Sequence, residues 1–189
     1  MTRRAEQEAL TRQRITESAV ALHGTVGPSQ TSMIAVAEHA GVRRSTLYRH
    51  FANEAALFDA CTAHWATENP PPDLPTWGEI GDPSERLRRA LEDLHAYYRH
   101  TEAMLDNLFR DESIMPLVAE RFAAFRSYLA AAQDALVAGR RLGRGEPAVR
   151  VRGAIGHAIS FSTWRSLVRE HGVSDADAVT LLCVLVSGS

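Results

Sequence analysis

The chain has 189 residues, with 21 basic and 23 acidic side chains, a net charge of −2 and 45% hydrophobic residues. This length and composition are typical of one or two globular domains. No run approaches the roughly 18 apolar residues that a membrane-spanning helix needs. The first ten residues, MTRRAEQEAL, are charged where a signal peptide would be apolar. We therefore expect a cytoplasmic protein without a membrane partner.

Cysteine and histidine are scattered along the chain. Cys61 and Cys183 lie far apart and outside any C-x-x-C motif, which predicts free thiols. His95 and His100 are spaced i, i+5, about 140° apart on a helix, which is poor for sharing a metal ion. A Gly-rich phosphate loop, a G-x-S-x-G elbow and an H-E-x-x-H motif are all absent from the sequence. The sequence predicts no enzyme, no metal site and no cofactor.

The segment from Thr31 to Phe51 has the pattern of two short helices around a glycine turn. The apolar positions of the first helix form one stripe at i, i+3, i+4 and i+7: Met33, Val36, Ala37 and Ala40. Ser32 or Thr31 can cap its start, because a short hydroxyl side chain accepts a bond from an unpaired backbone N–H. Gly41 can end it, since that position favours a positive φ.

The second helix has an apolar inner face, made by Val42, Leu47 and Phe51, and a polar outer face. Arginine can grip guanine or phosphate with paired donors, and hydroxyl groups commonly bind phosphate oxygens. The candidate DNA-binding residues are Thr31, Ser32, Arg43, Arg44, Ser45, Thr46, Tyr48, Arg49 and His50. The alternative is that these arginines only form a solvated face.

Charge supports the DNA-binding interpretation only in part. Residues 1–52 carry seven Arg and four acids, a net of +3, whereas residues 53–189 carry fourteen Arg and nineteen acids, a net of −5. No carboxylate lies between His39 and Asn53, so nothing there would repel phosphate. However, residues 147–169 are also free of acids and hold four Arg. The helix-turn-helix spacing, rather than charge, selects the candidate interface.

These residues resemble the TetR family of bacterial transcriptional regulators. The resemblance covers roughly the first 60 residues and rests on ordered matches: Ile15, Ala19, Leu22, Gly27, Thr31, Ser32, the AEHAGV and TLYRHF segments, and Leu57. It implies an all-α protein with a three-helix DNA-binding domain at residues 1–52, whose third helix enters the major groove. It further implies a helical ligand-binding and dimerisation domain at residues 53–189, linked by a helix from about 53 to 68.

The sequence departs from the family pattern at three positions. Arg43 stands where a serine usually caps the recognition helix, and Glu54 stands where a phosphate-binding lysine is usual. His23 replaces a buried phenylalanine, and we expect it to find a hydrogen-bond partner at the core edge. A second interpretation therefore stays open, in which the chain is a helical ligand-binding or protein-interaction module that no longer binds DNA.

Local signals predict the helices of the remaining chain. Asn53 can cap a helix that ends before Asn69, and an extended Pro-rich loop follows through Trp77 and Gly81. Asp82 can cap the next helix, carboxylates such as Asp111 and Glu112 are expected on solvated faces or ends, and further helices cover 118–136 and 147–171. Ser174 can cap the last helix.

The last two predicted helices are apolar on more than one face, which predicts that a second copy covers them. A four-helix bundle across a twofold axis would make a homodimer. The candidate interface residues are Ile155, Ile159, Ser162, Val179, Leu182 and Val186. A dimer would present two recognition helices to a near-palindromic operator with half-sites about 34 to 36 Å apart.

Bulky side chains in the larger region indicate a pocket for a small apolar or aromatic effector. The candidate lining residues are Trp65, Tyr97, Tyr98, Met104, Phe109, Phe122, Phe125, Tyr128, Phe161 and Trp164. Plain core packing is the alternative for most of them. Under the TetR resemblance, the expected activity is repression that the effector relieves.

Overall fold

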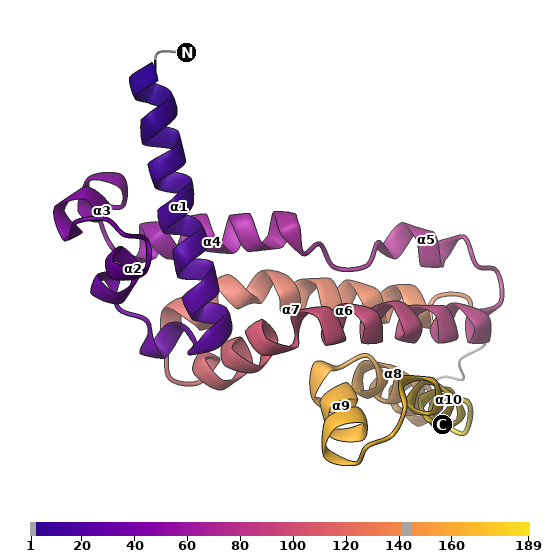
Figure 1. Ribbon diagram of the computed structural model, residues 1–189. Helices are drawn as coiled ribbons and strands as arrows, with labels where there is room; N and C mark the ends of the chain where they lie inside the picture. Colours follow the sequence, from indigo (N-terminus) through magenta and orange to yellow (C-terminus); the bar gives the residue numbers. More distant parts are fainter. Residues whose placement is uncertain (1–2, 141–144) are drawn as a thin grey trace. The chain divides into compact units, whose positions relative to one another are not determined.

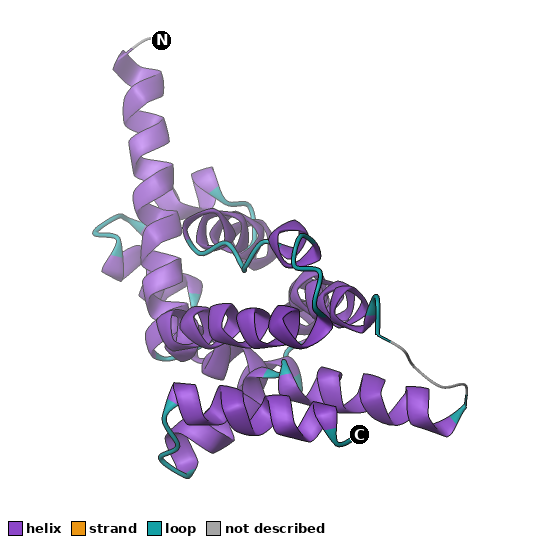
Figure 2. Ribbon diagram, turned by 90° about the vertical axis from the view of Figure 1, so that its right-hand side faces the viewer, coloured by secondary structure: helices purple, strands orange, loops and turns teal. Residues whose placement is uncertain are grey.

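The structure is a computed structural model that describes residues 3–140 and 145–189, and every regular element in these ranges is a helix (Figures 1 and 2). The all-α expectation is confirmed. The residues form two compact units. Unit 1 contains the chain up to Pro70 together with Thr101–Ala123, and unit 2 contains Pro71–His100 and Ala124–Ser189. The functional division at residue 52 stays a prediction.

Helices α6 and α7 contribute residues to both units. The other elements of unit 1 are α1 (Arg3–Thr25), η1 (Pro28–Gln30), α2 (Met33–His39), α3 (Arg44–His50) and α4 (Glu54–Glu68). The shared helices are α6 (Pro83–Glu112) and α7 (Pro116–Val137). Unit 2 adds α5 (Leu74–Gly78), α8 (Glu146–Ala158), α9 (Phe161–Arg165), η2 (Ser166–Glu170) and α10 (Asp175–Ser187).

Helix α2 begins and ends at the residues that the sequence indicated. The Ser32 hydroxyl oxygen accepts a hydrogen bond from the backbone N–H of Ala35 at 3.1 Å, which satisfies a donor at the helix start. Gly41 has a φ of 63°, the left-handed region that side chains disfavour. Just after it, the Val42 N–H donates to the Ala37 carbonyl at 2.9 Å and turns the chain into α3.

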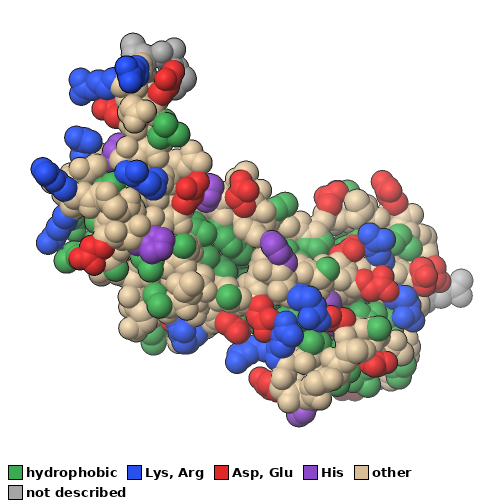
Figure 3. Space-filling model, viewed as in Figure 1, with side chains coloured by type: hydrophobic (Ala, Val, Ile, Leu, Met, Phe, Trp, Pro, Cys, Tyr) green, Lys and Arg blue, Asp and Glu red, His purple; other side chains and the backbone are tan. Residues whose placement is uncertain are grey.

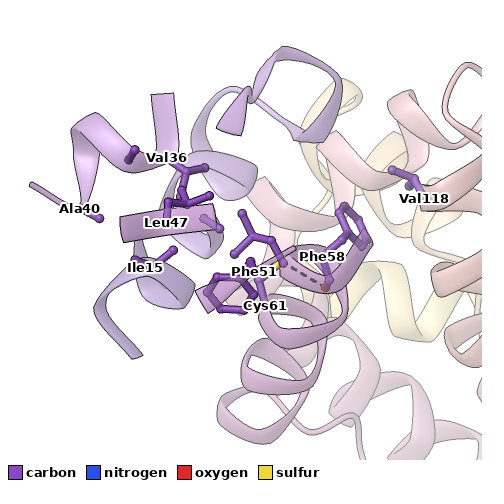
Figure 4. Close-up of a cluster of buried hydrophobic side chains, with 11 residues drawn as sticks. Ile15, Val36, Ala40, Leu47, Phe51, Phe58, Cys61 and Val118 are labelled. Carbon is purple, nitrogen blue, oxygen red and sulfur yellow. Dashed lines mark hydrogen bonds between the residues drawn. The ribbon is translucent and has the colours of Figure 1, made fainter. Parts of the chain in front are cut away.

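The core of unit 1 lies where the helix-turn-helix packs on α1, α4 and the start of α7 (Figure 4). Ile15 and Leu47 are fully buried, and Phe51 is 1% exposed. The buried side chains of this cluster are Ile15, Ala19, Val36, Ala37, Ala40, Leu47, Phe51, Leu57, Phe58, Cys61 and Val118. Fully burying a large apolar side chain contributes about 1.5–3 kcal/mol. This core fixes α3 against α1 and leaves its other face outward.

Two predicted segments differ from the structure. The loop through Trp77 is not wholly extended, because Asp73 and Pro75 start the short helix α5 and Trp77 is fully buried, donating from Nε1 to Asp93 at 2.9 Å. The single helix predicted over 147–171 is broken after Ala158. The hydroxyl of Ser160 there accepts from the Thr163 N–H and starts α9. A capping serine competes with helix continuation.

Other predicted boundaries are confirmed. Asn53 caps α4 by accepting from the Ala56 N–H at 2.9 Å, and α4 ends at Glu68. Asp82 accepts from the backbone of the first turn of α6, and Ser174 accepts from Asp177 N–H at the start of α10. In the ranges that the structure describes, no helix is long and apolar enough to cross a membrane.

Candidate nucleic-acid interface

Helix α3 holds its polar side chains outward because its apolar ones are anchored in the core. Leu47 is fully buried, while its neighbour Tyr48 is 40% exposed. The Arg44 guanidinium lies over the Tyr48 ring, 5.4 Å from the ring centroid, so two candidate DNA-binding side chains are held together. Stacking leaves the guanidinium donors and the phenol hydroxyl available to phosphate or base edges.

The other candidate DNA-binding residues surround this pair. Arg43, Ser45 and Arg49 are exposed, and Thr46 is half-buried. Arg43 occupies the position before α3 and makes no side-chain cap, so its guanidinium is not needed by the helix. In Figure 3 basic side chains gather along the edge of unit 1 where α3 lies. These residues supply the charge and donors that a phosphate backbone binds.

Three candidates have partners or surroundings that restrict their roles. The Ser32 oxygen caps α2, and the Thr31 hydroxyl donates to the Gly27 carbonyl at 2.8 Å. His50 Nε2 is buried and lacks a hydrogen-bond partner among the described residues. Desolvation and the charges of Arg49 and Arg12 lower the pKa of His50, so its imidazole is neutral at pH 7.

The end of α6 holds the turn between α1 and α2, which the sequence did not predict. The Asp111 carboxylate is fully buried and accepts from the Ser29 N–H at 2.8 Å. Arg110 pairs with Asp111 at 2.8 Å and donates from Nη2 to the Val26 carbonyl at 2.9 Å. We name the contacts of Arg110 and Asp111 with residues 26–29 the α6 clasp. The expectation that Asp111 is solvated is wrong, because its partners come from a segment distant in sequence.

A histidine and a cysteine form a polar spot inside unit 1. His23 is 8% exposed, and its Nδ1 lies 3.5 Å from the Cys61 sulfur. Asn107 on α6 donates to the His23 carbonyl at 2.9 Å. Burial lowers the pKa of His23 to about 4 and raises the pKa of Cys61 to about 12. At neutral pH both side chains are uncharged and suit the core.

The candidate effector-binding residues fall into local groups in both units. In unit 1, Phe109 packs edge-on against Phe122 with ring centroids 4.8 Å apart, and Trp65 and Met104 also belong to this unit. Unit 2 holds one group of Tyr97, Phe125 and Tyr128 and another of Tyr98, Phe161 and Trp164, with centroid distances of 5.4–6.1 Å within each group.

The second group lies next to buried polar side chains. His95 is 2% exposed, its Nδ1 is 3.6 Å from Asp175, and both ring nitrogens lack a hydrogen-bond partner among the described residues. The same carboxylate accepts from the Trp164 Nε1 at 3.0 Å and pairs with Arg99. The described residues contain no cluster of three or more His, Cys, Asp or Glu side chains arranged for a metal ion.

The candidate interface residues mostly face inward within their own unit. Ile155 is fully buried and Ile159, Val179, Leu182 and Val186 are 2–3% exposed, because α10 packs on α8. Only Ser162 is exposed. These five side chains therefore pack inside their own unit, and their placement in an interface stays a prediction. The exposed apolar residues of α10 are Leu181, Val184 and Leu185, at 51%, 66% and 47% exposure.

Comparisons with known proteins agree with this geometry. Residues 15–61 match the family model described as bacterial regulatory proteins, tetR family. The fold is similar to a candidate TetR-family transcriptional regulator from Mesorhizobium loti, with a TM-score of 0.64, 19% identity and coverage of 100% of this chain and 96% of that one. It is also similar to a TetR-like transcriptional regulator from Rhodococcus sp. RHA1, with a TM-score of 0.64, 22% identity and coverage of 95% and 94%.

A third solved structure with this fold is the multidrug binding protein EbrR in complex with imidazole. Its TM-score is 0.55 at 20% identity, with coverage of 92% of this chain and 93% of that one. A search of curated proteins finds no match. The family match covers α1 from Ile15 through the first half of α4, the region that positions α3.

Proposed function

We propose that this chain, whose residues 15–61 match the TetR family model, is a DNA-binding transcriptional regulator. In this proposal it is a homodimeric repressor that a small apolar or aromatic effector releases from a near-palindromic operator. The observation that carries the proposal is the outward pair of Arg44 and Tyr48, held on α3 by the buried Leu47. The family match favours DNA binding over a module that has lost it.

Dimerisation is supported by the uncovered face of α10. Leu181, Val184 and Leu185 lie at i, i+3 and i+4, so they form one apolar stripe beside the buried face of α10. A stripe of this kind favours packing against a second helix, and a twofold copy supplies one of the same shape. We propose this stripe, rather than the buried residues of α8 and α10, as the dimer interface.

The nature of the effector is supported by the aromatic group around Trp164. Tyr98 and Trp164 are fully buried, and Phe161 is 3% exposed. Flat aromatic side chains prefer offset or edge contacts with other rings, so they favour a ligand that carries an aromatic ring. EbrR, which shares the fold, binds imidazole, a small aromatic ring. We propose His95 as the polar contact, since its two ring nitrogens lack partners.

Release from DNA is supported by the α6 clasp. Helix α6 is continuous from Pro83 to Glu112, and its last residues hold the turn that precedes α2. An effector that prefers one position of α6 would change the position of the helix-turn-helix through these contacts. The change in operator-binding free energy cannot exceed the difference in the effector's binding free energy between the two positions of α6.

Selection of bound sequences from a random DNA pool tests this function. We expect the wild-type protein to enrich a near-palindromic consensus, while the Arg44→Ala variant at the same salt concentration enriches none. Enrichment without dyad symmetry would contradict the dimer. No enrichment by the wild-type protein would contradict sequence-specific DNA binding.

A further inference from the structure

Arg12 of α1, which is not among the candidate DNA-binding residues, makes two contacts with the end of α3. Its Nη1 donates a hydrogen bond to the His50 carbonyl at 2.6 Å. Its guanidinium carbon lies 4.1 Å from the centroid of the Phe51 ring. His50 is the last residue of α3 and Phe51 is its C-cap. One side chain from another helix therefore closes the carboxyl end of the recognition helix.

The carbonyl contact matters because α3 is short. The helix has seven residues, Arg44–His50, so most of its carbonyl groups lie in its last turn. The Phe51 N–H satisfies the Leu47 carbonyl at 2.9 Å, but the carbonyls at a helix end otherwise lack an intrahelical partner. A cation at this end also stabilises the helix through its dipole. Arg12 supplies both the donor and the positive charge.

The ring contact joins the same guanidinium to the core. Phe51 is only 1% exposed and belongs to the buried cluster of unit 1. Arg12 lies three residues before Ile15 and seven before Ala19, so it shares the face of α1 that packs into this cluster. The exposed side chain covers the outer side of the Phe51 ring. A planar guanidinium can stack and donate at once, whereas a lysine ammonium cannot reproduce both contacts.

We propose that Arg12 is a positioning residue that fixes the orientation of α3 for sequence-specific DNA recognition, and that it acts through His50 and Phe51 rather than by binding phosphate. Phosphate contacts would strengthen binding to any duplex, whereas the orientation of α3 matters only where its side chains must meet base edges. Arg12 therefore sets the preference for operator over random DNA. This inference rests on the proposed function, because it requires that α3 reads DNA.

The test compares Arg12→Gln and Arg12→Lys with Arg14→Gln, which removes the same charge from an exposed position of α1. The probes are a duplex selected from a random pool by the wild-type protein and a random-sequence duplex of equal length. Each dissociation constant is measured over a salt series. Thermal unfolding of each variant sets a measurement temperature at which it is folded.

For both Arg12 variants we expect binding to the selected duplex to weaken about tenfold, the size of one lost charge-assisted contact. Binding to the random duplex and the slope of log Kd against log salt should stay within error of wild type. A slope reduced by about one in Arg12→Gln, with recovery in Arg12→Lys, would show a phosphate contact and overturn the proposal. Equal values for Arg12→Gln and wild type would overturn it too. A wild-type protein that selects no sequence would instead refute the proposed function.

Discussion

The Asp111 carboxylate accepts a hydrogen bond from the Ser29 N–H at 2.8 Å, although the two residues are 82 positions apart in sequence. Burial alone would raise the pKa of Asp111, but hydrogen bonds from Arg110 and Ser29 outweigh it and lower that pKa. The carboxylate therefore stays ionised at the end of α6. This charged, buried acceptor ties the turn before α2 to the last residues of α6, which belong to the same unit.

Gly27 should tolerate no side chain, because the α6 clasp occupies the space. A Cβ built there would lie 2.0 Å from Arg110 Nη2 and 2.8 Å from Asp111 Oδ2, and the φ of 96° adds strain. We expect Gly27→Ala to reduce the free energy of unfolding by about 2–4 kcal/mol, measured by urea denaturation. Gly41→Ala is the control, since its φ is also positive but nothing lies within 4 Å. Equal losses in both variants would mean that backbone strain, and not the clasp, explains the effect.

The outward residues of α3 should affect DNA affinity but not stability. Removing the Arg44 guanidinium or the Tyr48 hydroxyl deletes donors from exposed positions, so the core stays intact. We expect Arg44→Ala to weaken binding to the selected duplex by about 1–3 kcal/mol and Tyr48→Phe by about 1 kcal/mol, with unchanged unfolding midpoints. Gel-shift titrations at one salt concentration measure both. If both variants bind the selected duplex with wild-type affinity, α3 is not part of the DNA interface.

Stability should fall on mild acidification. Burial lowers the pKa of His23 and of His95 to about 4, below the usual 6.5 that each side chain regains on unfolding. Between these values the unfolded chain binds more protons, so the free energy of unfolding decreases as pH falls from 6.5 to 4. Each histidine contributes at most about 3 kcal/mol to this loss.

His23→Phe isolates one of these contributions, because a phenyl ring has no nitrogen that can bind a proton. We expect urea denaturation of this variant to show a shallower dependence on pH between 6.5 and 4 than the wild type. His39→Gln, at an exposed position, should keep the wild-type dependence. A His23→Phe curve parallel to that of the wild type would show that His23 does not titrate on unfolding.

The stripe on α10 should control assembly. Val184, the middle residue of the stripe, is 66% exposed. A carboxylate at this position would have to be desolvated in a helix-to-helix contact. We expect Val184→Glu to be a folded monomer by light scattering at concentrations where the wild type is a dimer. Ile114→Glu, a matched change at a residue 68% exposed in unit 1, should remain a dimer. Dimers of the Val184→Glu variant would place the interface elsewhere.

Local sequence patterns predicted the helices that carry the candidate DNA interface. The Ser32 cap, the Gly41 turn and the buried Leu47 each depend on residues within a few positions, so spacing alone identifies them. The Arg12 and Asp111 contacts escaped prediction because their partners lie 38 and 82 residues away. The periodic pattern of a local segment does not indicate contacts between residues so far apart in sequence.

The inward face of α10 shows a second limit of sequence patterns. Both faces of this helix are apolar, and periodicity cannot tell which one the chain itself buries. Packing on α8 buries Val179 and Leu182, so the uncovered face carries Leu181 and Val184 instead. The break at Ser160 was missed for a different reason. Its cap is as local as that of Ser32, but the apolar pattern continues on both sides of it.

Titration of the wild-type protein against a selected full-site duplex and against the same duplex with one half-site scrambled tests the central claim most directly. If two copies of α3 read two half-sites, the full site binds two protomers, and scrambling weakens binding at least about a hundredfold at constant salt, as the loss of several base contacts at 1–3 kcal/mol each requires. Equal affinity for both duplexes, or one protomer per full site, would contradict a dimeric DNA reader.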